Sequence, residues 1–74
     1  MYNRYCISIY CDGFSIGGTY VSDEPDSRSL KNKLFEHEGD FVEFTTEKDD
    51  FIQVRKSLIN GIHIYNHNNH DKGE

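Results

Sequence analysis

The first twenty residues carry the pattern that most constrains the fold. Apolar and polar residues alternate from Arg4 to Cys11, the dipeptide Asp12-Gly13 follows, and a further stretch continues to Tyr20. Alternation is typical of a half-buried strand, and Asp-Gly is a preferred two-residue turn of a β-hairpin. The sequence therefore predicts that the chain begins with an antiparallel hairpin.

Folding the chain at this turn also predicts the register of the two strands. The apolar face then contains four cross-strand pairs: Cys11 with Phe14, Ile9 with Ile16, Ile7 with Gly18, and Tyr5 with Tyr20. The opposite face combines mostly small and polar residues: Tyr10 with Ser15, Ser8 with Gly17, and Cys6 with Thr19. A slip of one residue would turn the apolar set toward solvent, so the register is well specified. The Gly17-Gly18 pair predicts a bulge or a closely packed helix.

A helix is expected after this hairpin. Asp26 and Ser27 are candidate N-caps, and Leu30 and Leu34 are spaced four residues apart, as on one helical face. Gly39 is placed to end the helix, because glycine readily adopts the left-handed conformation found there. The chain therefore predicts a helix of about three turns in this segment.

The rest of the chain predicts a strand, a second helix and a final strand. Residues 40–46 have Val42 and Phe44 on their apolar face. The second helix is expected to begin at Thr46 and end at Asn60-Gly61, with an apolar stripe at helical spacing formed by Phe51, Ile52, Val54, Leu58 and Ile59. The last strand contains Ile62 and Ile64.

The expected order is therefore ββαβαβ, which predicts an α+β fold. We expect a four-stranded mixed sheet with two helices on one face, because a helical link suits a right-handed parallel crossover. The chain has 74 residues, near the lower end of what folds without disulfides or metals. We predict one compact domain over residues 1–65 and a disordered, Asn/His-rich polar tail over residues 66–74.

Charge and composition exclude several classes of function. The net charge of −5 disfavours non-specific binding to nucleic acid and to anionic membranes. No stretch approaches the roughly 20 apolar residues of a membrane span, and the first residues do not resemble a signal peptide. Cys6 and Cys11 would lie about 16 Å apart on one strand, too far for a disulfide. We therefore expect reduced thiols and a cytoplasmic protein, located in the host cytosol if a phage encodes it.

The residues suited to catalysis or metal binding do not form a recognisable motif. His63, His67, His70 and Asp71 are suitable ligand types for zinc or nickel, but the surrounding asparagines disfavour the helix that would bring them together. Cysteines and serines occur without a histidine and an acid at defined spacing. The sequence predicts a protein that is not an enzyme and binds no metal or cofactor.

The main functional signal is an acidic segment. Seven carboxylates stand against the single cation Lys48: Glu36, Glu38, Asp40, Glu43, Glu47, Asp49 and Asp50. Phe41, Val42 and Phe44 lie between them, so the charges are expected on a folded surface rather than a tail. The last three acids suit the start of the predicted second helix. The first four have no such local reason.

In size, charge and compactness the chain resembles the small acidic antagonists encoded by bacteriophages, which include anti-CRISPR proteins and DNA mimics; the resemblance includes no shared motif. The main hypothesis is a non-enzymatic inhibitor that binds the basic groove of a nucleic-acid-handling protein through these seven carboxylates. One alternative is a small adaptor or structural protein that dimerises through its open sheet face or the edge of its last strand. Another is a weak RNA or single-stranded DNA binder that uses Tyr10 and Tyr65.

Overall fold

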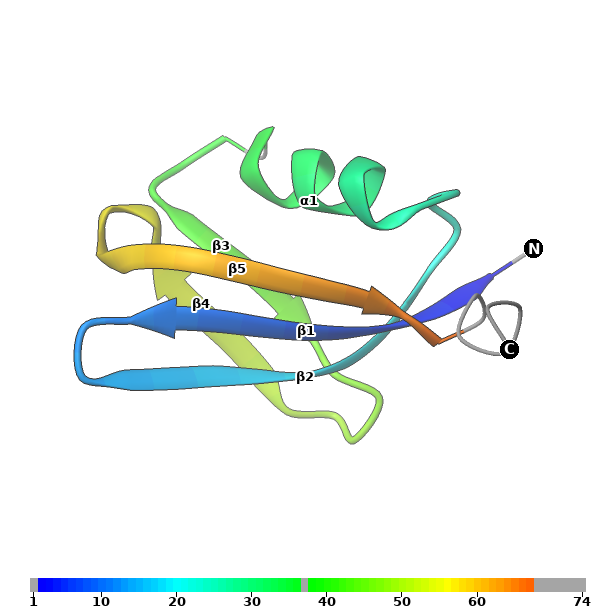
Figure 1. The fold of residues 1–74 in the computed structure, drawn as a ribbon, viewed down its shortest axis with the longest axis horizontal. Helices are drawn as coiled ribbons and strands as arrows, with labels where there is room; N and C mark the ends of the chain where they lie inside the picture. The colour runs from blue at the N-terminus through cyan, green and yellow to red at the C-terminus, as the bar shows by residue number, and fades with distance from the viewer. Residues whose placement is uncertain (1, 37, 68–74) are drawn as a thin grey trace.

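Two antiparallel sheets and one helix make up the part of the chain that the computed structural model describes, residues 2–36 and 38–67 (Figure 1). The first sheet has the order β2-β1-β5, and the second pairs β3 with β4. The elements are β1 (Asn3–Cys11), β2 (Phe14–Ser22), α1 (Ser27–Glu36), β3 (Phe41–Thr45), β4 (Phe51–Arg55), the 3₁₀ helix η1 (Lys56–Leu58) and β5 (Ile59–Asn66). Figure 1 shows β3 and β4 crossing behind the three-stranded sheet.

The predicted four-stranded mixed sheet with two helices on one face is wrong. The predicted second helix is replaced by β4, η1 and the start of β5, and the strand pairings among the described residues are all antiparallel. Residues 51–55 follow a period of two, with Ile52 and Val54 buried and Phe51 exposed. So short an apolar segment fits the 3.6-residue period of a helix as well as the two-residue period of a strand. Pairing with β3 decides in favour of the strand.

The predicted first hairpin is confirmed pair for pair, from Cys11 with Phe14 to Tyr5 with Tyr20. Tyr5, Ile7 and Ile9 are completely buried and form the centre of the core. At the turn end the apolar face is less well covered, since Phe14 is 53% exposed. The register therefore follows from the sequence, whereas the extent of burial follows from what packs on the sheet.

The two glycines of β2 are required by neighbouring backbone and side chains, not by the bulge or helix expected from the sequence. A Cβ atom on Gly17 would overlap the backbone carbonyl of Ile7 in β1. A Cβ atom on Gly18 would lie 2.6 Å from Cγ2 of Thr46, in the turn between β3 and β4. The glycines thus permit close approach on both sides of β2.

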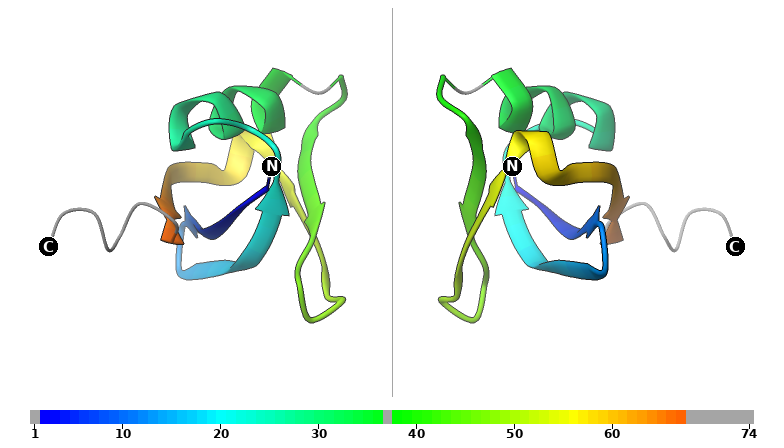
Figure 2. Two further views of the ribbon diagram at one scale, coloured as in Figure 1. Left: turned by 90° about the vertical axis from the view of Figure 1, so that its right-hand side faces the viewer. Right: turned by 90° about the vertical axis from the view of Figure 1, so that its left-hand side faces the viewer.

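Helix α1 closes the space between the two sheets, as Figure 2 shows from both ends of the molecule. Its predicted N-cap is confirmed: Asp26 Oδ1 accepts a hydrogen bond from Ser29 N–H at 2.8 Å, and this bond holds the pKa of Asp26 below its usual value. Leu30 and Leu34 are buried, as predicted, against the core residues of both sheets. The Lys56 ammonium donates to the Phe35 carbonyl at 2.9 Å, which ties η1 to the end of α1.

The turn between β3 and β4 occupies the position where the second helix was expected to begin. Thr46 N–H donates to the Asp50 carbonyl at 2.8 Å, and Asp50 N–H donates to Thr46 Oγ1 at 3.1 Å. Asp49 has φ of 69°, a left-handed conformation that Asp tolerates better than most residues. Glu47 N–H donates to the Thr19 carbonyl at 2.9 Å, which anchors the turn to β2. Thr46 therefore closes a hairpin turn instead of capping a helix.

The predicted last strand is confirmed as β5. Ile62 and Ile64 belong to β5 and pack against the core. Asn66, which was assigned to the polar tail, is the buried last residue of that strand. Residues 68–74 of the predicted tail lie outside the described residues.

Candidate functional site

The net charge of the protein is concentrated in one segment. Between Glu36 and Arg55 there are seven carboxylates and two cations, Lys48 and Arg55, so this segment alone accounts for the net charge of −5. The remaining acidic and basic residues balance. We call the seven carboxylates the acidic layer: Glu36, Glu38, Asp40, Glu43, Glu47, Asp49 and Asp50.

Strand β3 divides the acidic layer into two groups. Glu36, Glu38 and Asp40 precede β3 and form what we call the acidic corner. Glu47, Asp49 and Asp50 follow β3 and form the acidic tip. A strand of five residues spans about 17 Å, so the two groups lie at opposite ends of the hairpin. The carboxylates therefore form an extended row and do not converge on one point.

The acidic tip is largely explained by local structure. Glu47 forms an ion pair at 3.1 Å with Arg4, a residue of β1. Asp49 takes the left-handed position of the turn, and the Asp50 backbone closes it through Thr46. The predicted helix start was the wrong local reason for these acids, but the turn supplies another.

The acidic corner has no comparable structural role. Glu36 is the last residue of α1, where the helix dipole disfavours a carboxylate. Glu38 and Asp40 are exposed, and the three side chains form no ion pair within the part of the chain described. The Asp40 carbonyl does accept the Lys56 N–H at 2.7 Å, which fixes the backbone of the corner. The corner thus presents exposed carboxylates on an anchored loop.

Glu43 links the two groups across the outer face of the hairpin. It lies opposite Gln53, whose amide is 3.4 Å from the Glu43 carboxylate. Phe51, on the same face, is 61% exposed, although its spacing predicts a place in the apolar stripe of a helix. A period-two interpretation of residues 51–55 would have put it outside. Next to the corner, the Arg55 guanidinium lies 5.0 Å from the Phe41 ring centroid.

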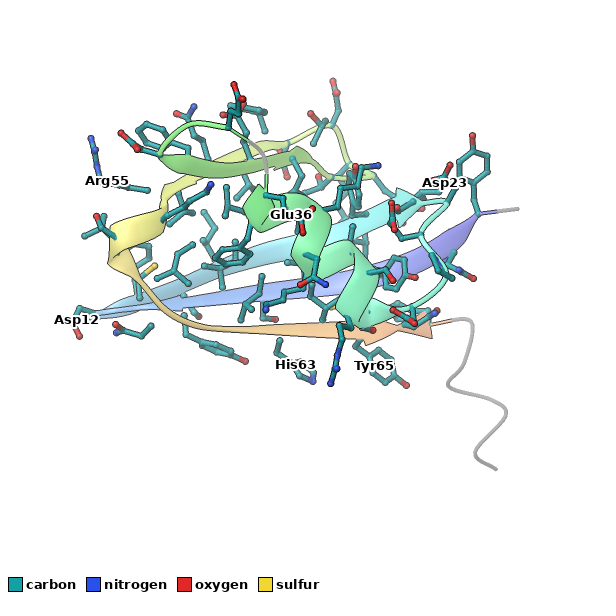
Figure 3. The ribbon with its side chains drawn as sticks, turned by 90° about the horizontal axis from the view of Figure 1, so that it is seen from above. Asp12, Asp23, Glu36, Arg55, His63 and Tyr65 are labelled. Atoms are coloured by element: carbon teal, nitrogen blue, oxygen red, sulfur yellow. The ribbon has the colours of Figure 1, made fainter. Side chains whose placement is uncertain are left out.

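The three-stranded sheet, unlike the acidic layer, has strands without carboxylates. None of its strands β1, β2 and β5 contains Asp or Glu. Figure 3 shows His63 and Tyr65 projecting on the side of the molecule away from the Arg55 end of the hairpin. Tyr10, 47% exposed, lies beside Gly61, whereas Tyr65 lies beside Cys6, about 13 Å further along β1. The two predicted aromatics share a face without adjoining each other.

Metal-binding groups do not gather in the described residues. No cluster of three or more His, Cys, Asp or Glu suited to a metal is found among them. Of the four candidate ligands, His70 and Asp71 lie outside the described residues, and His67 contacts the Tyr65 ring at 5.3 Å between centroids. Cys6 and Cys11 are free, as predicted.

Within residues 2–36 and 38–67 no helix is long and apolar enough to cross a membrane. No protein-family model matches the chain, and the comparisons with curated proteins and with solved structures give no match. The candidate site therefore depends on the geometry of the chain alone.

Proposed function

We propose that this protein is a non-enzymatic inhibitor whose acidic layer binds the basic groove of a nucleic-acid-handling protein. The acidic corner and Glu43 make the principal contacts. The observation that carries the proposal is the concentration of the entire net charge in the segment from Glu36, the last residue of α1, to Arg55, the last residue of β4. The action of small phage-encoded antagonists is the model for this mechanism.

The physical basis is competition for cations. A groove that binds nucleic acid presents Lys and Arg to phosphates, and fixed carboxylates engage the same groups. Because the corner is held by the Asp40–Lys56 backbone bond and the Phe35–Lys56 contact, little conformational entropy is lost on binding. The charge asymmetry between the two sheets also orients the approaching partner.

The first experiment is affinity capture of partners from the native host, followed by mass spectrometry. Binding to the captured partner is then compared for two variants that each neutralise three carboxylates. The corner variant is Glu36→Gln, Glu38→Gln, Asp40→Asn, and the matched tip variant is Glu47→Gln, Asp49→Asn, Asp50→Asn.

We expect the corner variant to lose about tenfold or more in affinity, equivalent to about 1.4 kcal/mol, and the tip variant to lose much less. Equal losses would contradict the assignment to the corner. Unchanged affinity in both variants would contradict the proposed function itself. Partner nuclease, polymerase or DNA-binding activity, measured with and without the protein, tests the inhibition.

The alternatives have less support. A homodimer through the outer face of the three-stranded sheet would have only a small flat face available to it, about 30 Å by 14 Å. Direct RNA binding through Tyr10 and Tyr65 lacks cations, since Arg4 is paired with Glu47.

We place the action of the protein in the cytosol, which fits its free cysteines.

A further inference from the structure

A groove separates helix α1 from strand β5, and none of its lining residues belongs to the acidic layer. Its volume is about 590 Å³, within the range of ligand-binding pockets. The helix contributes polar and cationic residues and the strand contributes apolar ones: Ser27, Arg28, Lys31, Asn32, Ile62 and Ile64. The groove therefore combines a basic wall with an apolar floor.

The strand side of this groove also offers unpaired backbone groups. In a two-residue hairpin the pair that flanks the turn, here Cys11 and Phe14, exchanges both backbone hydrogen bonds. Alternate residues of β1 therefore bond toward β5, where their partners are Gly61, His63 and Tyr65. The N–H and C=O groups of Ile62 and Ile64 consequently point away from β1, to an edge with which no strand of the described chain pairs.

The two outer edges of the three-stranded sheet differ in how they are protected. The edge of β2 is met by the β3–β4 turn, through the bond from Glu47 N–H to the Thr19 carbonyl. The edge of β5 carries no Lys, Glu, Asp or Pro, which are the residues that commonly prevent strand addition. Strand β5 is thus the edge suited to receive another extended chain.

The charges around the groove indicate that the incoming chain is acidic. Arg28 and Lys31 are exposed and one helical turn apart on the wall of the groove, and β5 contributes no carboxylate. Asp26, at the start of the helix, is engaged by Ser29 N–H. A second copy of β5 paired antiparallel with the first would bring two such cation pairs into one interface, where like charges repel. An acidic segment would instead be attracted.

We propose that an extended, acidic peptide segment of a partner protein docks in the groove between α1 and β5. Its backbone pairs with Ile62 and Ile64, and its carboxylates face Arg28 and Lys31. This site is separate from the acidic layer, so the protein carries two binding surfaces of opposite charge. The inference does not depend on the proposed inhibitory function.

The test is an NMR titration of the isotope-labelled protein with a short peptide of alternating Val and Glu, blocked at both ends. We expect the largest amide shift changes at Ile62, Ile64 and Asn32. The variant Arg28→Glu/Lys31→Glu should lose about tenfold or more in affinity. The variant Lys33→Glu/Lys48→Glu, which changes the net charge equally outside the groove, should retain binding.

Two modified peptides separate backbone pairing from charge alone. A peptide N-methylated on the alternate residues that would pair with β5 keeps its carboxylates but loses the donors, so its affinity should fall sharply. A peptide with Lys in place of Glu should not bind. The proposal is overturned by the absence of shifts at millimolar peptide, by shifts elsewhere, or by equal affinity for the N-methylated peptide. Dimerisation that Arg28→Glu/Lys31→Glu abolishes, without peptide binding, would assign the groove to a second copy and also overturn it.

Discussion

The two sheets of this protein differ in what they contribute. The β2-β1-β5 sheet contains no carboxylate in its strands and supplies three completely buried residues, Tyr5, Ile7 and Ile9. The β3–β4 hairpin is shorter, and the segment from Glu36 to Arg55 that contains it carries the entire net charge. The difference shows that both sheets supply buried residues to the core, whereas the net charge lies in the segment that contains the smaller sheet. That segment can therefore be charged without carboxylates in the strands of the larger sheet.

The smaller layer depends on the larger one. An isolated two-stranded hairpin is at best marginally stable in water, and this one gains stability by burying its inner side chains. Those side chains are Val42, Phe44, Ile52 and Val54. The predictions below address this dependence, in order of decreasing effect.

The largest effect is expected at Gly17, in the larger sheet. The Gly17→Ala Cβ atom would overlap the Ile7 carbonyl, so β1 and β2 cannot both keep their positions. We expect a loss of at least about 3 kcal/mol, comparable to the whole stability of a domain this small. Urea unfolding followed by circular dichroism measures it. Gly61→Ala, where no atom lies within 4 Å of the new methyl group, is the control and should be nearly neutral.

The next largest effect distinguishes the observed strand β4 from the predicted second helix. Ile52→Ala should cost about 2–5 kcal/mol because the side chain is only 5% exposed. Phe51→Ala should cost less than about 0.5 kcal/mol because Phe51 faces solvent. If the predicted second helix were present, with both residues in its apolar stripe, both substitutions would cause a large loss of stability. Equal large losses in thermal unfolding would therefore contradict the β3–β4 pairing.

A smaller effect is expected at Thr46, where the hairpin meets the larger sheet. Thr46→Val keeps the shape but removes the acceptor for Asp50 N–H, at a cost of about 1–2 kcal/mol. Thr46→Ser keeps the hydroxyl but loses the methyl group that contacts Gly18. Hydrogen exchange of the Asp50 amide should increase in the Val variant and not in the Ser variant. Faster exchange in the Ser variant than in the Val variant would show that packing of the Thr46 methyl group on β2 fixes the hairpin, and not the hydrogen bond from Asp50 N–H to Thr46.

The smallest effect is expected at Tyr5, whose hydroxyl donates to the Glu24 carbonyl at 2.7 Å. Tyr5→Phe should lose about 1 kcal/mol at neutral pH. Burial raises the pKa of Tyr5 above its usual value of 10.0, so folding favours the protonated form. This contribution is present below pH 10 and is lost as the pH rises through the folded pKa. The stability difference between Tyr5→Phe and the unsubstituted protein should therefore shrink at alkaline pH; a constant difference would contradict the assignment.

The sequence predicted the elements whose signals are local. The Asp12-Gly13 turn set the register of β1 and β2, and Asp26 marked the beginning of α1. The segment after Thr46 was mispredicted because a Thr followed by acidic residues suits a helix N-terminus as well as a hairpin turn. The candidate site was found as a set of charges, and the separation of its last three acids from the first four was also predicted. The position of those three acids in a hairpin turn was not.

By itself, the sequence determined the first hairpin, the helix N-cap and the presence of an acidic surface, because turn, cap and charge each depend on residues close together in the chain. The tertiary structure alone decided that residues 51–55 form a strand, that the last three acids lie in a hairpin turn, and that β5 has an open edge. These features depend on which strands meet across the core, and that choice is made by packing and hydrogen bonding between distant segments.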